Sequence, residues 1–169
     1  ILTGNAIFIE RTADVGVIPP EVALNYGLTG PNLRASGHGY DLRKEEPYSI
    51  YDKFDFDVVV GKGKYGTVGD CWDRTYVRMQ ECLESLKIID QCLIKLNHEL
   101  KRDKEFNPRA LVPKKIRPKA GDYYVRAENP KGELGFFFRT DGRSDIPVRC
   151  KVRGGSFVNL SVLPELSKG

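Results

Sequence analysis

The sequence predicts an α+β protein with short helices first, one long amphipathic helix of a helical bundle next, and a small antiparallel β-meander at the C-terminal end. Apolar residues recur in steps of three and four over residues 67–100, which is typical of an amphipathic helix. Apolar and charged residues alternate over 53–60, and again between turn signals over 122–160, as in strands. We expect a single partial domain spanning residues 1–169, a fragment lacking both ends.

Residues 1–52 carry frequent glycines between short apolar stretches, so we expect two or three short helices joined by tight loops. One helix is expected from Pro19 to Gly27, because proline suits the first turn of a helix and glycine suits its end. Residues 53–60 are predicted to form a half-buried strand. One face of that strand carries the apolar side chains of Phe54, Phe56, Val58 and Val60.

The long helix, residues 67–100, is the strongest structural signal in the chain, and it should pack against other helices. Its apolar face carries Trp72, Tyr76, Met79, Leu83, Leu86, Ile89, Leu93, Leu96 and Leu100. Thr67 and Asp70 resemble a capping box at the start of this helix.

A basic linker is expected over residues 101–121, which carry a net charge of +6 against +4 for the whole chain. Pro108, Pro113 and Pro118 forbid a sustained helix there. The body of the protein is near neutral, so the charge pattern does not indicate a nucleic-acid partner.

The last third, residues 122–160, reads as three antiparallel strands. Asn129–Gly132 forms the first turn, with proline at its second position, and Asp141-Gly142 forms the second turn. The third strand is expected over residues 146–153.

Cysteine usage gives no metal site. Cys71, Cys82, Cys92 and Cys150 form no Cys-x-x-Cys pair and have no histidine at ligand spacing, so we expect small buried apolar residues in a reducing compartment. No apolar run approaches the roughly 20 residues of a membrane-spanning helix, and any membrane association should come through partner subunits.

A glycine-rich stretch over residues 61–68 fits G-x-G-x-x-G-x-V, a pattern shared by protein kinases and dinucleotide-binding folds. The other kinase motifs are absent, and the position where a dinucleotide fold needs an acidic residue falls inside the long helix. We therefore expect an exposed connection between the strand and the helix.

Several separated motifs together resemble the quinone-side, D-type subunit of respiratory complex I (NADH:quinone oxidoreductase). That family is similar to the large subunit of nickel-iron hydrogenases. The motifs, in order, are Asn5 with Phe8 and Arg11, Gly27–Gly37, Asp41-Leu42-Arg43, Pro47-Tyr48, Gly69-Asp70 with Arg74 and Arg78, Pro130–Gly135, and Arg149-Cys150-Lys151. The resemblance covers nearly the whole chain apart from the basic segment.

The resemblance implies a subunit of a proton-translocating enzyme, with no activity for the isolated fragment. Electrons from NADH would pass through FMN and iron-sulfur clusters in partner subunits to quinone, the substrate in a shared cavity. The partners implied are other complex I subunits, above all the one carrying the terminal iron-sulfur cluster, and indirectly the membrane arm. The implied location is peripheral, at the cytoplasmic face of the inner membrane. No nucleic acid is implied, and no cofactor is held by this chain alone.

The resemblance also implies the candidate site. The Pro130 turn matches a hydrogenase turn that places an arginine beside the metal centre, and Lys131 stands at that position. We expect Lys131, Gly132 and Glu133 to line the quinone cavity, where a cation can hold the oxyanion of a reduced quinone. Glu133 would pair with Lys131 or relay protons. A solvated turn without a role is the alternative, and no residue is assigned a catalytic or metal-binding role.

Seven further charged residues are expected to build the scaffold or a subunit interface through buried ion pairs. They are Arg34, Asp41, Arg43, Asp70, Arg74, Arg78 and Arg149. Two other functions remain open: the large subunit of a membrane-bound nickel-iron hydrogenase, and a non-catalytic interaction module. The family usually has another helix where this chain has residues 101–121, and Pro-Gly-Phe where it has Gly155-Ser156-Phe157.

Overall fold

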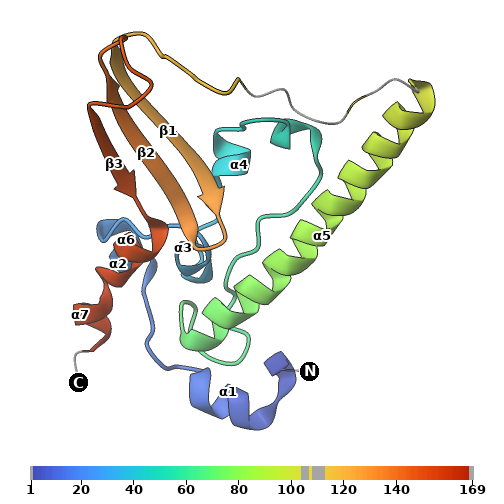
Figure 1. Cartoon of the computed structure of the whole chain (residues 1–169). Coiled ribbons are helices and arrows are strands. Elements are labelled where there is room, and N and C mark those ends of the chain that lie inside the picture. Colours follow the sequence, from blue (N-terminus) through green and yellow to red (C-terminus); the bar gives the residue numbers. More distant parts are fainter. Residues whose placement is uncertain (1, 104–106, 108–112, 168–169) are drawn as a thin grey trace.

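The computed structural model describes residues 2–103, 107 and 113–167, and it confirms the α+β architecture (Figure 1). A three-stranded sheet and the long helix α5 form two arms that diverge from a group of short helices. The elements, in chain order, are a 3-10 helix Leu2–Gly4, α1 Ala6–Thr12, α2 Pro20–Asn25, α3 Pro31–Ala35, α4 Leu42–Glu45, a 3-10 helix Tyr51–Lys53, α5 Cys71–Arg102, β1 Gly121–Asn129, β2 Gly132–Thr140, β3 Arg149–Arg153, α6 Gly155–Leu160 and α7 Leu163–Leu166.

Four short α-helices occupy the first fifty residues, where the sequence predicts two or three. The predicted helix after Pro19 is confirmed as α2, with proline in its first turn and Gly27 beyond its end at a φ of +65°. The extra helices are only four to seven residues long, too short to show an apolar period of their own.

The predicted strand over residues 53–60 is wrong, although the chain there is extended and buries Phe54 and Phe56. The neighbour of this segment is a helix, so no strand ladder forms. Side chains of α5 hold the backbone instead. Gln91 accepts from the Asp55 N–H and donates to its carbonyl, and Glu84 accepts from the Asp57 N–H. Alternation in the sequence correctly indicated the buried face without indicating the partner.

Helix α5 begins at Cys71 and ends at Arg102, so the long helix is confirmed with a later start than the predicted residue 67. Asp70 is its N-cap and accepts the Asp73 N–H at 2.7 Å, while the Thr67 hydroxyl bonds to Asp14 instead. The middle of the predicted basic linker, residues 104–106 and 108–112, lies outside the described residues.

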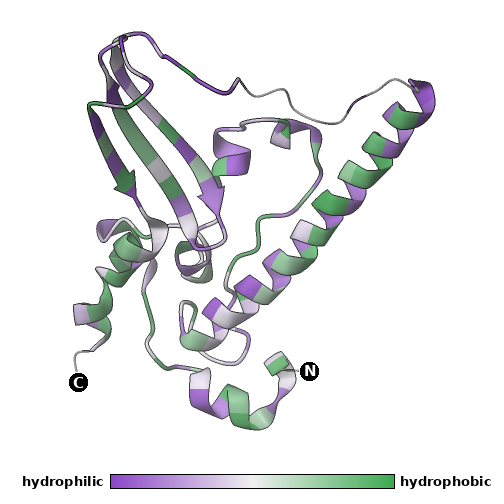
Figure 2. Ribbon diagram, in the orientation of Figure 1, coloured by the Kyte–Doolittle hydropathy of each residue, from purple (hydrophilic) through white to green (hydrophobic). Residues whose placement is uncertain are grey.

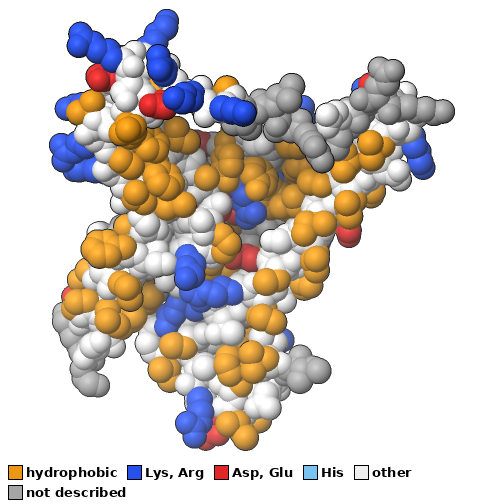
Figure 3. Space-filling model, in the orientation of Figure 1, with side chains coloured by type: hydrophobic (Ala, Val, Ile, Leu, Met, Phe, Trp, Pro, Cys, Tyr) orange, Lys and Arg blue, Asp and Glu red, His pale blue; other side chains and the backbone are white. Residues whose placement is uncertain are grey.

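Only the first turns of α5 are buried, at Trp72 and Val77. Apolar residues from Met79 to Leu100 alternate with polar ones along the helix (Figure 2) and are largely exposed. The space-filling view shows hydrophobic side chains gathered along this arm and on the sheet (Figure 3). Within the described residues, no helix combines the length and the apolar character needed to cross a membrane.

The β-meander is confirmed, with strand order β1-β2-β3 and antiparallel pairing throughout. The second turn is longer than the predicted Asp141-Gly142 hairpin, because the Asp141 carboxylate accepts the N–H groups of Arg143 and Ser144 and extends the loop. The third strand therefore starts at Arg149. Residues 155–160, which the sequence places in the meander, form α6 instead.

A compact apolar core joins the two ends of the chain: Val162, just before α7, packs with Ile18, Ala23, Leu28 and Leu33. The Tyr26 hydroxyl donates to Glu165 at 2.9 Å across the same contact. The loop before α3 and the start of α7 are thereby fixed beneath the β1–β2 turn.

Candidate functional site

The first buried group of charges, here called the Arg34 cluster, consists of Arg34, Asp41, Arg43, Glu81 and Glu128. Arg34 belongs to α3, and its side chain is only 2% exposed. Its Nε donates to Glu81 on α5 at 2.6 Å, and its Nη1 donates to Glu128 on β1 at 2.9 Å. One guanidinium therefore ties both arms of the molecule to the short helices between them.

Asp41 adds the second layer of the Arg34 cluster. It caps α4 and lies 3.6 Å from the Arg34 guanidinium, while Arg43 donates to its two oxygens at 3.0 and 2.7 Å. Burial alone would raise the pKa of Asp41, but the hydrogen bonds and charge of Arg43, with the charge of Arg34, lower that pKa below its usual range. Burial raises the pKa of Glu128, and Arg34 only partly opposes it.

The predicted buried ion pairing of Arg34, Asp41 and Arg43 is thus confirmed. Glu81 and Glu128 were missed, because they lie 47 and 94 residues from Arg34 in the chain. No local pattern in the sequence marks such distant partners.

The β1–β2 turn lies directly beside this cluster, with Pro130 and Lys131 at its tip between paired Asn129 and Gly132. The turn is pressed against the start of α3. A Cβ added to Gly30 would lie 2.3 Å from the Gly132 Cα, and Gly30 has a φ of +66°. Only glycine fits at this crossing, so the position of the turn is set by backbone contact.

Glu133, the residue after the turn, centres a second group, here called the Glu133 cluster, with Arg126, Arg153 and Glu46. Its carboxylate lies 3.2 Å from the Arg126 guanidinium and 3.5 Å from that of Arg153. Arg126 also forms an ion pair with Glu46. The predicted pairing of Glu133 with Lys131 is therefore wrong: the neighbouring arginines on β1 and β3 point at the buried carboxylate, and the lysine does not.

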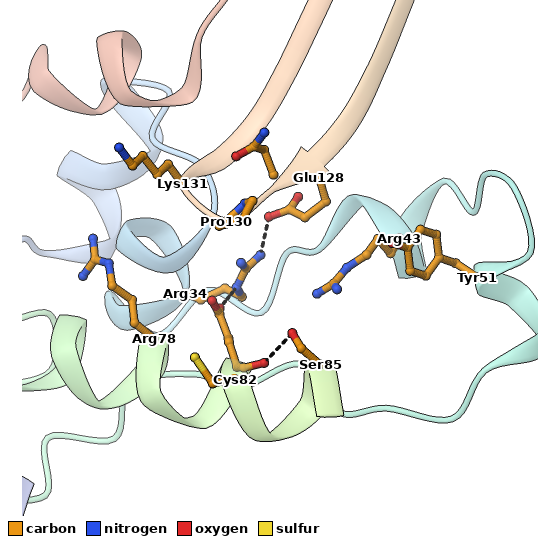
Figure 4. Close-up of a pocket in the computed structure, with 11 residues that line it drawn as sticks. Arg34, Arg43, Tyr51, Arg78, Cys82, Ser85, Glu128, Pro130 and Lys131 are labelled. Atoms are coloured by element: carbon orange, nitrogen blue, oxygen red, sulfur yellow. Dashed lines mark hydrogen bonds and ion pairs between the residues drawn. The ribbon is translucent and has the colours of Figure 1, made fainter. Parts of the chain in front are cut away.

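A cleft of about 540 Å³ opens between α5 and the β1–β2 turn (Figure 4). Its walls come from α3, α4, α5 and the turn, and most of them are charged or polar. They are Arg34, Arg43, Tyr51, Arg78, Glu81, Cys82, Ser85, Glu128, Asn129, Pro130 and Lys131. Among the described residues, Lys131 has no ion-pair partner, whereas Glu128 and Glu133 are both paired. The cleft thus combines a satisfied charged floor with one exposed ammonium group.

Arg78 stands on the α5 side of the cleft, and in Figure 4 its guanidinium extends on the same side as Lys131. It donates to the Asn32 side chain and to the Arg74 carbonyl, both at 2.7 Å. Burial, together with the charge of Arg74, lowers the pKa of Arg78. The cleft therefore has two cations on this side.

The other predicted scaffold residues lie away from the cleft. Asp70 and Arg74 organise the start of α5, where Asp70 also accepts the Asp14 N–H and Arg74 donates to the Gly69 carbonyl and the Cys71 sulfur. Arg149 is exposed on β3. The structure therefore brings Arg34, Asp41, Arg43, Arg78 and Lys131 together and leaves Arg149 apart.

The glycine-rich stretch is closed by the protein's own carboxylates. Asp73 accepts the Gly63 N–H at 2.9 Å, and Asp14 accepts the Thr67 N–H at 2.8 Å. Backbone N–H groups of this kind cradle phosphate in nucleotide-binding loops. Here they are occupied, which gives a physical reason for the sequence-based exclusion of nucleotide binding.

Metal ligands do not converge anywhere within the described ranges, where no group of three His, Cys, Asp or Glu side chains is arranged to hold an ion. The expectation of buried cysteines is wrong: Cys71 is half-buried, and Cys82, Cys92 and Cys150 are exposed. Cys82 and Cys92 lie on the part of α5 that no other described element covers.

Taken together, the fold and the site define a scaffold protein whose rigid, charged interior presents one cationic turn at the edge of a cleft. Over residues 1–169 the sequence matches the family model "Respiratory-chain NADH dehydrogenase, 49 Kd subunit". The chain belongs to this family. The match favours the respiratory family over the hydrogenase alternative.

Similar curated proteins are D-type subunits of NADH-quinone oxidoreductase. The first of two such subunits in Cytophaga hutchinsonii is 66% identical over 99% of this chain and 43% of the relative. The D-type subunits of Amoebophilus asiaticus and Chlorobaculum tepidum are 56% and 57% identical over 100% of this chain and 42% and 41% of their own lengths. The chain thus spans about two fifths of the length of the curated relatives it matches.

Proposed function

We propose that this chain forms part of the wall of the quinone cavity in a proton-translocating NADH:quinone oxidoreductase. Its relatives are named as subunits of NADH-quinone oxidoreductases. The observation that carries the proposal is Lys131, a cation without an ion-pair partner among the described residues, at the tip of a turn that borders the cleft. Gly132 and Glu133 belong to the same wall.

The chemical role of Lys131 follows from charge. A quinone gains negative charge on its oxygens as it accepts electrons, and a nearby ammonium group stabilises that charge most when it is already in place. The Arg34 and Glu133 clusters neutralise the two carboxylates that flank the turn, Glu128 and Glu133. Because these carboxylates are paired elsewhere, the Lys131 ammonium stays available to a ligand in the cleft.

The proposal includes partners. The electrons would come from NADH through FMN and iron-sulfur clusters in other subunits, with the subunit that carries the terminal cluster facing the cleft. The membrane arm would be reached indirectly, and the chain would lie peripherally at the cytoplasmic face of the inner membrane. The exposed apolar residues of α5 support an assembly role, because exposed apolar patches are typical of interfaces.

The proposal is tested by Lys131→Ala in the complete enzyme. We expect NADH:quinone reductase activity to fall by about tenfold to a hundredfold, the range for loss of a preorganised charge-stabilising group. NADH oxidation by ferricyanide, which reports on the flavin, should be unchanged. Lys131→Arg, which keeps a positive charge, should retain most of the activity.

Lys151→Ala is the matched control, because Lys151 is an exposed lysine on β3. Quinone reduction that is equal in Lys131→Ala and Lys151→Ala would remove Lys131 from the site. If the variant chain then still binds the cluster-bearing subunit in a pull-down, with no quinone bound in a titration, the interaction module would be the better description.

A further inference from the structure

A single side chain on α6 holds the backbone of the Lys131 turn. The Asn159 amide nitrogen donates to the Lys131 carbonyl at 3.0 Å and to the Thr29 carbonyl at 3.2 Å. Its amide oxygen accepts the Thr29 N–H at 3.1 Å. Both amide hydrogens and the oxygen are therefore used, and the reversed amide would place oxygen against two carbonyls.

Thr29 extends this hold to the other side of the turn. Its hydroxyl accepts the Glu133 N–H at 3.1 Å, and the adjacent Gly30 lies against Gly132. Lys131 is thus fixed at its own carbonyl through Asn159, and two residues later through Thr29. All the groups that Asn159 contacts are backbone atoms, so it acts on the path of the chain and not on the lysine charge.

We propose that Asn159 is a positioning residue for Lys131: it sets the direction in which the ammonium group reaches the cleft. This inference rests on the proposed function of Lys131. The carbonyl orientation of a residue is coupled to its backbone dihedrals, and these determine where its side chain points. Asn159 touches neither the cleft nor a ligand in it, since it is not among the cleft-lining residues.

The test is Asn159→Asp in the complete enzyme, with a short-chain quinone as the varied substrate. Aspartate has the same shape and keeps the acceptor for the Thr29 N–H, but it cannot donate to the Lys131 carbonyl. We expect the KM for quinone to rise by about threefold to tenfold, the equivalent of one hydrogen bond, with less than about a twofold change in kcat. Asn25→Asp, the same change at an exposed position, should leave both constants unchanged.

A double-mutant cycle with Lys131→Ala separates positioning from a general structural role. If Asn159 acts through the lysine, Asn159→Asp should raise KM no further in the Lys131→Ala background. Effects that multiply would overturn the inference. So would an unchanged KM in Asn159→Asp while Lys131→Ala is impaired, and the proposed function would then stand alone. An unimpaired Lys131→Ala enzyme would instead remove the proposed function first.

Should Asn159→Asp prevent assembly, Asn159→Ser serves as the second variant, because its hydroxyl still offers one donor. The expected rise in KM is then about twofold to threefold, again absent in the Lys131→Ala background. Normal ferricyanide reduction by the purified enzyme confirms that the variant complex is intact. A KM equal to that of the unmodified enzyme overturns the inference.

Discussion

Two clusters of buried charge hold the β1–β2 hairpin, and they are built from opposite residue types. Glu128 and Glu133 are cross-strand neighbours, an arrangement that is unfavourable for like charges. Glu128 belongs to the Arg34 cluster, where a buried cation is surrounded by carboxylates. Glu133 is a buried carboxylate between two arginines. Each carboxylate thus has its own positive partner.

The difference between the two clusters is their access to water. Arg34 and Glu128 have 2% and 4% of their side chains exposed, whereas Arg126 and Arg153 beside Glu133 are 30% and 31% exposed. Charges that reach water are screened when their partner is lost, and fully buried charges are not. The Arg34 cluster should therefore be the more costly of the two to break.

The largest effect is expected for Arg34→Ala, which leaves the Glu81 and Glu128 carboxylates without their cation. We expect the free energy of unfolding of the full-length subunit to fall by about 3–5 kcal/mol, measured by urea denaturation. Arg149→Ala, at an exposed site, should stay within about 0.5 kcal/mol of the unmodified subunit. A small loss for Arg34→Ala would show that water enters the cluster.

A smaller effect is expected for Glu133→Gln, which keeps the shape of the side chain and removes its charge. The two arginines can turn to solvent, so we expect a loss of about 1–2 kcal/mol in the same measurement. A loss as large as that of Arg34→Ala would mean that exposure of the arginines does not set the cost. The comparison between the two clusters would then fail.

The smallest effect concerns pH and Asp41. Because the pKa of Asp41 is lowered in the folded state, its stabilisation is present above the unfolded pKa and is lost as pH falls through the folded one. Glu128, with a raised pKa, has the opposite sign and gains a proton more readily when folded. Asp41→Asn should flatten the decline in stability below about pH 4 by about 1 kcal/mol or less.

Thermal denaturation of the full-length subunit over a pH series measures this slope. Asp55→Asn, at an exposed aspartate, is the matched control and should follow the unmodified subunit. If Asp41→Asn shows the same acid decline as the unmodified subunit, other groups carry it.

Features set by neighbours in the chain could be predicted from the sequence. The helix over most of residues 67–100, the hairpin around Pro130 and the pairing of Asp41 with Arg43 all rest on short spacings. Features set by distant partners could not. Phe54 and Phe56 alternate as in a strand, yet their neighbour is a helix, and no spacing in the sequence carries that fact.

The candidate site divides in the same way. Lys131 was identified through its motif, but the groups that neutralise its surroundings, such as Glu81 and Arg126, come from far along the chain. Asn159 had no signal at all, because a half-buried asparagine on a short helix resembles any other polar surface residue. The partners of buried charges become visible only when the fold places them.

The glycine-rich stretch before α5 has a consequence for reading such motifs in general. Asp14 and Asp73 are covalently attached to the loop whose amides they bind, so they compete with any dissolved anion at a high effective concentration. The protein carries its own occupant for the nest. A glycine pattern followed by an aspartate in the first turn of the next helix can therefore indicate a sealed joint, where the helix dipole is satisfied from within.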